Sequence, residues 1–212
     1  MSTTLSVPFA PALGSAAAHV AASNAASARF FERQADSVAR ACRAMAARFQ
    51  RNGRLLAYGE GAQRSDVSHV VVEFVHPVIV GKRALPALSL TADIATVTGV
   101  ANRVGLSEVF AHQIRLLAEP PDIALGLSAD GNCTNVLYGL EQARRIGMLT
   151  VALLGGDGGA IAASGVADHV LVAAATDPRV IKEVHVTMYH ILWELVHVFF
   201  EQPGVLDPGV VR

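Results

Sequence analysis

A histidine, a glutamate and a second histidine stand inside an apolar stretch, SHVVVEFVHP at residues 68–77. A strand would alternate polar and apolar residues, whereas in a helix His69, Glu73 and His76 follow spacings of four and three and share one face. Burying a carboxylate among valines costs several kcal/mol unless a cation or hydrogen-bond donors meet it. The pair at positions 69 and 73 could bind a divalent metal, act as a base with its orienting partner, or simply satisfy itself at a subunit interface.

Two glycine-containing turns are a second group of candidates: YGEGAQRSD at 58–66 and LSADGNCTN at 127–135. Each follows a short apolar run and precedes a helical pattern. Glycine lets backbone N–H groups approach an anion, and Asn132 or Ser128 can cap the helix that follows. Such turns are also common as purely structural connections, so neither predicts a ligand by itself.

Composition limits the classes of protein that this chain can belong to. Its 212 residues are 52% hydrophobic, which indicates one domain with a large core and further apolar surface between subunits. No apolar run is long enough to span a membrane and the first residues lack a signal peptide's basic start, so we expect a soluble, cytoplasmic protein. The net charge of −1 and the scattered basic residues argue against nucleic-acid or membrane partners. Cys42 and Cys133 are too few for a disulfide framework.

Short apolar runs alternate with helical patterns along most of the chain, which predicts βαβ units. The expected fold is α/β, a flavodoxin-like three-layer sandwich with a five-stranded parallel sheet and long terminal helices over about 26–52 and 178–201. The strands should end near these residues: Tyr58, Leu90, Ser128, Leu154 and Val172. We expect a flexible arm over 1–25, a single domain over 26–202 and a tail over 203–212. In such a sheet, ligands bind at the carboxyl ends of the strands.

Together these segments resemble the sugar isomerase (SIS) domain, and within it the phosphoheptose isomerase group, which interconverts sedoheptulose 7-phosphate and a heptose 7-phosphate. The resemblance runs in order from about residue 30 to residue 200. The family's GNGGS turn matches GEGAQ (59–63), its H-x-x-x-E helix matches His69 and Glu73, and its STSGNS turn matches SADGNC (128–133). Its later glycine-rich turn and its closing Q-E-x-H-x-x-x-x-H helix match LLGGDGG (153–159) and KEVHVTMYH (182–190).

The resemblance implies a role for each matched residue. Glu73 matches the general base that moves a proton between C2 and C1 through an enediol, and His190 matches the general acid at the sugar oxygen. His69, Glu73 and His190 also match three of the four zinc ligands of some family members, so zinc is the possible cofactor. The substrate-binding candidates are Gly59, Gly61, Gln63, Asp93, Ser128, Asp130, Asn132, Cys133 and Lys182.

The sequence departs from the family at the fourth zinc ligand, a glutamine, which is Lys182 here. An ammonium cannot coordinate a metal, and its charge would compete with one if it lay beside His69, Glu73 and His190. The site is then metal-free unless His185, or His76 by its spacing, substitutes as a ligand. Lys182 could instead polarise a substrate carbonyl, or form a salt bridge to Glu73 or Glu183.

The expected phosphate site departs further. Where the family places small hydroxyl residues, this chain has Gln63, Asp130 and Cys133. A carboxylate at position 130 would repel a phosphate by about 1 kcal/mol in water and by several times that in a half-buried site. Glu60 adds negative charge, whereas Arg64 could offset it. An unphosphorylated or nucleotide-linked sugar is therefore an alternative ligand.

Two classes of function remain open. The first is a sugar-phosphate aldose–ketose isomerase, and the second is a non-catalytic SIS module that senses a ligand, docks a protein or serves another enzyme. Retention of the residues at 69, 73 and 190, with Asp93 at a strand end, favours the enzyme; loss of the phosphate hydroxyls and of the glutamine favours the binder. In either case the apolar terminal helices predict a homotetramer, a dimer of dimers.

Overall fold

The structure is a computed structural model that describes residues 9–202, with side chains from residue 14 onward. Five parallel strands form one sheet in the order β2-β1-β3-β4-β5. The strands are β1 (Leu55–Gly59), β2 (Ala87–Ser89), β3 (Ile123–Ser128), β4 (Leu149–Gly155) and β5 (His169–Ala173). They end at or within one residue of the expected positions, and the expected α/β fold with an all-parallel sheet is confirmed.

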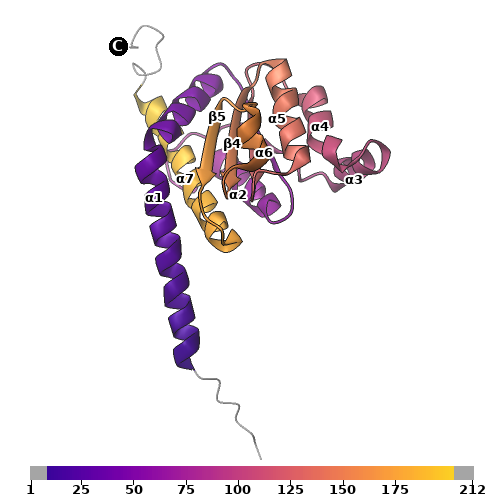
Figure 1. Cartoon of the computed structure of the whole chain (residues 1–212). Helices are drawn as coiled ribbons and strands as arrows, with labels where there is room; N and C mark the ends of the chain where they lie inside the picture. The colour runs from indigo at the N-terminus through magenta and orange to yellow at the C-terminus, as the bar shows by residue number, and fades with distance from the viewer. Residues whose placement is uncertain (1–8, 203–212) are drawn as a thin grey trace, which may run out of the picture.

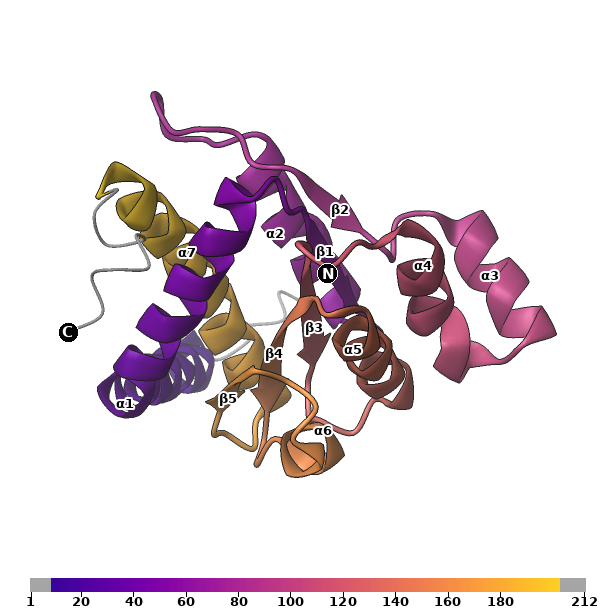
Figure 2. The ribbon, with the colours of Figure 1, turned by 90° about the horizontal axis from the view of Figure 1, so that it is seen from above.

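Helices cover both faces of this sheet (Figures 1 and 2). One layer holds α1 (Phe9–Gln50), α2 (Gln63–Val75) and α7 (Pro178–Glu201). The other holds α3 (Ile94–Arg103), the 3-10 helix η1 (Leu106–Glu108), α4 (Val109–Leu117), α5 (Thr134–Ile146) and α6 (Gly159–Ser164). Among residues 9–202, no helix combines the length and the apolar character needed to cross a bilayer.

The strand side chains divide between two cores with the period of two that a sheet imposes. In β1, Leu55 and Ala57 pack against the α1, α2 and α7 layer, whereas Leu56 and Tyr58 face the opposite layer. Both faces are buried, which explains why the strands appear in the sequence as continuous apolar runs without alternation. The helices are thereby held at defined positions over the sheet.

The first helix is longer than expected. It begins at Phe9, so residues 9–25 are helical and are not part of an arm, as we had expected. Alanine has the highest helix propensity, and the alanine-rich segment before Ala26 continues the helix although most of its described side chains are exposed. Burial against the domain begins at Ala26 and Phe30. The rest of the expected arm and the tail after Gln202 lie outside the described residues.

Local signals set the start of α7 and the end of α5. Asp177 caps α7 by accepting a hydrogen bond from the Arg179 backbone N–H, and Pro178 occupies the first helical position. Gly147, in the left-handed conformation, ends α5 and leads directly into β4. The expected span of 178–201 for the last helix is therefore confirmed.

His185 lies on the face of α7 that packs into the core. Its side chain is fully buried, and neither ring nitrogen makes a hydrogen bond of ordinary geometry among the described residues, although the Leu154 backbone is close enough to act on the ring. Burial lowers the pKa of His185, and Asp66 and Lys182 are the charged groups that act on it. This histidine is a packed, neutral residue and not the substitute metal ligand considered from its spacing.

We predict that His185 makes stability depend on pH. Because its pKa is lowered in the folded state, the unfolded chain binds the proton first as the pH falls below about 6.5, and stability decreases from there. His185→Leu should reduce that loss by up to about 1.4 kcal/mol per pH unit. Urea unfolding between pH 7.5 and 5.5, roughly this window, measures it. An unchanged slope in His185→Leu would contradict the prediction, and the exposed His76→Gln is the control.

Candidate active site

Three side chains meet between α2 and α7. Nε2 of His69 lies 3.3 Å from Oε1 of Glu73, one turn along α2, and 3.5 Å from Nε2 of His190 on α7. One ligand atom from each residue falls within 4.8 Å of the other two. The Glu73 side chain is 13% exposed and that of His69 is 42% exposed, so the carboxylate is shielded while the imidazole still reaches solvent. The helical spacing predicted His69 and Glu73 correctly, whereas His76 lies just beyond the end of α2 and is not part of the group, so it is not the substitute ligand. A single chain suffices to assemble the three residues.

Tyr189 orients this group. Its hydroxyl lies 2.7 Å from Nδ1 of His69, on the side of the ring opposite to Glu73. Burial raises the pKa of the Tyr189 phenol, and the negative charges of Asp66 and Glu73 add to this, so the hydroxyl keeps its proton. A partner on Nδ1 fixes the ring orientation and leaves Nε2 facing Glu73 and His190. Tyr189 was not among the residues expected from the sequence, although it precedes His190 directly.

Lys182 does not lie where we expected it. Its ammonium donates to Oδ1 of Asp66 at 2.7 Å and, at 3.1 Å each, to the Ala62 carbonyl and the Ser65 hydroxyl. These acceptors form the start of α2, before His69. The expected position beside the three site residues and the alternative salt bridges to Glu73 or Glu183 are therefore wrong. The Asp66 side chain is only 5% exposed, and an ammonium is the partner that such a carboxylate requires.

The turn between β3 and α5 is closed by its own side chains. Ser128 is buried; its hydroxyl accepts from the Gly131 N–H at 2.9 Å, and its single proton is shared between Oδ1 of Asp130 at 3.3 Å and Sγ of Cys133 at 3.1 Å. Asp130 accepts from the Asn132 N–H at 2.9 Å. Neither Ser128 nor Asn132 caps α5, because Cys133 is the N-cap residue and makes no side-chain capping bond. Our expectation that one of them caps this helix is wrong.

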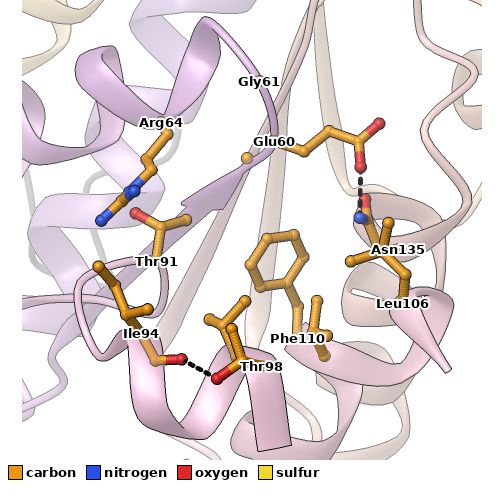
Figure 3. Close-up of a pocket in the computed structure, with 12 residues that line it drawn as sticks. Glu60, Gly61, Arg64, Thr91, Ile94, Thr98, Leu106, Phe110 and Asn135 are labelled. Carbon is orange, nitrogen blue, oxygen red and sulfur yellow. Dashed lines mark hydrogen bonds between the residues drawn. The ribbon is translucent and has the colours of Figure 1, made fainter. Parts of the chain in front are cut away.

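A pocket of about 260 Å³ lies at the carboxyl end of β1, between the start of α2 and the α3 to α5 side (Figure 3). Gly59 and Gly61 contribute backbone to it. Glu60 accepts a hydrogen bond from Nδ2 of Asn135 at 2.5 Å, and Oδ1 of Asn135 has no partner among the described residues. The apolar wall is formed by Ile94, Val97, Leu106, Val109 and Phe110. The pocket therefore combines this apolar wall with two charged residues, Glu60 and Arg64.

The remaining candidates have other structural roles. Asp93 caps α3, and its hydrogen bonds from Thr96 and Ala95 lower its pKa; it does not line the pocket at β1. Gln63 is buried with its Oε1 unpartnered in the described structure, so its side chain points into the protein. Asp66 was also missed, although its spacing of three before His69 places it on the same face of α2.

Comparisons with known proteins agree with this geometry. The SIS domain family profile matches residues 18–155. The chain belongs to the SIS domain family and, within it, to the phosphoheptose isomerases. A phosphoheptose isomerase of Desulfovibrio desulfuricans is 40% identical over 181 residues, covering 84% of this chain and 85% of that protein. That of Solidesulfovibrio magneticus is 38% identical over 193 residues, covering 91% and 93%. The solved phosphoheptose isomerase structure from Francisella tularensis superimposes with a TM-score of 0.83 at 27% identity, covering 88% and 98%.

We predict that Lys182 stabilises the fold of this isomerase family member. Lys182→Met leaves the Asp66 carboxylate buried without a cation, so the free energy of unfolding should fall by about 2 kcal/mol. The exposed salt bridge between Arg145 and Glu141 is the control, since its loss in Arg145→Met should cost less than about 0.5 kcal/mol. Denaturant unfolding of the three proteins measures both. Equal stability of Lys182→Met and the natural sequence would exclude this role.

Proposed function

We propose that this chain is a sugar-phosphate isomerase that interconverts an aldose and a ketose, as its phosphoheptose isomerase relatives are named to do. The observation that supports this best is the meeting of His69, Glu73 and His190 between α2 and α7. Proton transfer between adjacent carbons needs a base and an acid within reach of one small substrate. A shielded carboxylate and two imidazoles in contact distance meet that requirement.

In the proposed reaction, Glu73 removes the proton from the carbon next to the substrate's carbonyl group. His190 donates a proton to the carbonyl oxygen, and a neutral enediol results. Glu73 then returns its proton to the neighbouring carbon while the hydroxyl on the other carbon gives its proton to His190, which restores both groups and completes the isomerisation. His69, held by Tyr189, keeps its Nε2 between the base and the acid and so maintains their spacing.

We further propose that the same three residues hold a zinc ion. Two imidazole nitrogens and one carboxylate are a donor set found in catalytic zinc sites, which keep one position open for water or substrate. With zinc bound, the ion would polarise the substrate's carbonyl group in place of the proton from His190, because an imidazole nitrogen that binds zinc carries no proton. Tyr189 supports this arrangement, since Nδ1–H of His69 can donate to its hydroxyl while Nε2 faces the ion. Lys182 does not oppose it, because its charge is neutralised by Asp66.

A second candidate function is a non-catalytic module that binds a sugar without turning it over. The observation that favours it is the β3–α5 turn, where Asp130 accepts the hydrogen bonds that a phosphate would need. Such a module would bind a ligand while lacking isomerase activity. The intact base and acid make isomerisation the better supported proposal.

We predict that Glu73→Gln reduces isomerisation of sedoheptulose 7-phosphate by at least about a hundredfold, since the amide cannot accept the carbon-bound proton. The fold should be retained, because an amide of the same shape replaces the carboxylate. Glu119→Gln is the matched control, as Glu119 lies in the segment that leads into the start of β3, whereas Glu73 lies on α2. The rate of aldose formation, measured at fixed times for both variants and the natural sequence, distinguishes the two variants. An active Glu73→Gln variant would refute the assignment of Glu73 as the base.

We predict about one zinc ion per chain in protein purified without chelator, as measured by mass spectrometry of the metal content. His69→Ala should abolish tight binding, and Tyr189→Phe should weaken it by about tenfold because His69 loses its orienting partner. Competition with a chromophoric chelator measures these affinities without using activity. Absence of zinc from the natural protein, even after addition of the metal, would remove this part of the proposal.

We also propose that the protein is a homotetramer. The exposed apolar residues of the described chain include Val20 on α1, with 56% of its surface accessible. Together with the projecting first part of α1 (Figure 1), they offer surface for other copies. Light scattering at micromolar concentration should give about four times the chain mass of 22.2 kDa. A monomeric mass would contradict the proposal.

A further inference from the structure

The turn between β3 and α5 lies where a parallel sheet normally receives an anion. It follows the carboxyl end of β3, beside the point at which the strand order changes direction between β1 and β3. The N-terminus of α5, a helix of 13 residues, begins directly after it and carries a partial positive charge. Backbone N–H groups at such a place favour a phosphate or a carboxylate.

In this chain the anion at that place is Asp130. Its Oδ1 accepts from the Asn132 N–H at 2.9 Å and from the Ser128 hydroxyl at 3.3 Å. The Ser128 hydroxyl also accepts from the Gly131 N–H at 2.9 Å. Two backbone N–H groups of the turn, those of Gly131 and Asn132, and the Ser128 hydroxyl are thus engaged inside the turn, and the Asp130 carboxylate supplies negative charge.

The rest of the fold holds this turn in place. Gly131 has a φ of +75°, and a Cβ built on it would lie 2.0 Å from the Gly158 carbonyl oxygen, so no larger residue fits. Its carbonyl accepts from the Ile161 N–H at 2.9 Å, and Oδ1 of Asn132 accepts from the Ala160 N–H at 3.1 Å. The turn is therefore fastened to α6. Movement of the turn's backbone would break these hydrogen bonds. A phosphate that enters therefore meets the Asp130 carboxylate in its present position.

A second carboxylate adds to the negative charge beside the turn. Glu60, in the turn after β1, is bound to Asn135 of α5. Burial raises the pKa of the Cys133 thiol to about 11 despite its hydrogen bond from Ser128, and Glu60 and Asp130 act in the same direction as burial. The β3–α5 turn therefore presents acceptors and negative charge, which suit donating hydroxyl groups and disfavour a phosphate dianion at this turn.

We propose that Asp130 determines substrate specificity by excluding phosphate from the β3–α5 turn, so that the substrate presents a neutral, hydroxyl-bearing end there. This inference rests on the proposed function, since it assigns the orientation of the sugar in the same site. The phosphate of a sugar phosphate then lies on the pocket side at β1. Arg64 is the one basic residue among the described residues that line that pocket, and its side chain extends along the pocket wall (Figure 3).

The test is calorimetric titration of the full-length protein with inorganic phosphate at low ionic strength, after removal of metal by chelator. Asp130→Asn keeps an acceptor for the Asn132 N–H but removes the charge, and it should bind phosphate at least about tenfold more tightly than the natural sequence. Asp130→Ser should do the same by adding a hydroxyl. Arg64→Gln should remove the weak binding that the natural sequence shows.

Asp177→Asn is the matched control, because Asp177 also accepts a backbone N–H two residues on at 2.9 Å and carries the same charge. It should change phosphate affinity by less than about twofold. Phosphate binding by Asp130→Asn no tighter than by the natural sequence would overturn the proposal, as would weak binding that survives Arg64→Gln. The titration requires no turnover. If the proteins show these phosphate affinities but the natural sequence has no isomerase activity, the proposed function is refuted and the inference about Asp130 stands. If the natural sequence is an active isomerase without these affinities, the inference is refuted and the proposed function stands.

Discussion

The ion pair between Lys182 and Asp66 is the contact on which the arrangement of the site depends. It joins the first turns of α7 and α2, two helices that lie on the same face of the sheet. Once these turns are held together, the two helices run past each other so that His190 arrives beside His69 and Glu73. The buried carboxylate needs its cation, and the base and acid obtain their spacing from that requirement.

The two sides of the candidate site have different chemistry. The α2–α7 side has a base, an acid and an orienting tyrosine, which are suited to moving protons. The ends of β1 and β3 have the carboxylates of Glu60 and Asp130, which are suited to accepting hydrogen bonds. The proton-transfer groups and the acceptors at the ends of β1 and β3 therefore rest on separate elements of the fold, and substitutions in one group can leave the other unchanged.

Much of this arrangement follows from patterns that are local in the sequence. Continuous apolar runs predicted the five strands, and the spacing of His69 and Glu73 predicted the polar face of α2. The partner of Lys182 could not be predicted in the same way, because a long flexible side chain can reach several carboxylates and only packing selects Asp66. The role of Tyr189 likewise depends on how α7 is rotated against α2, which periodicity does not determine. The hydrogen bond from Asn135 to Glu60 joins distant segments and leaves no local signal.

Because α1 is buried along only part of its length, its two parts should unfold separately although they form one continuous helix. From Ala26 onward its apolar side chains pack into the main core, so amide protons there should exchange with solvent only when the whole domain unfolds. Over residues 14–25 the side chains are mostly exposed, and His19 and Ser23 both contact Glu183 of α7. That part can lose its helical hydrogen bonds by local opening while the sheet and the α2–α7 pairing stay intact. In the proposed tetramer, this part of α1 would gain order where neighbouring copies cover it.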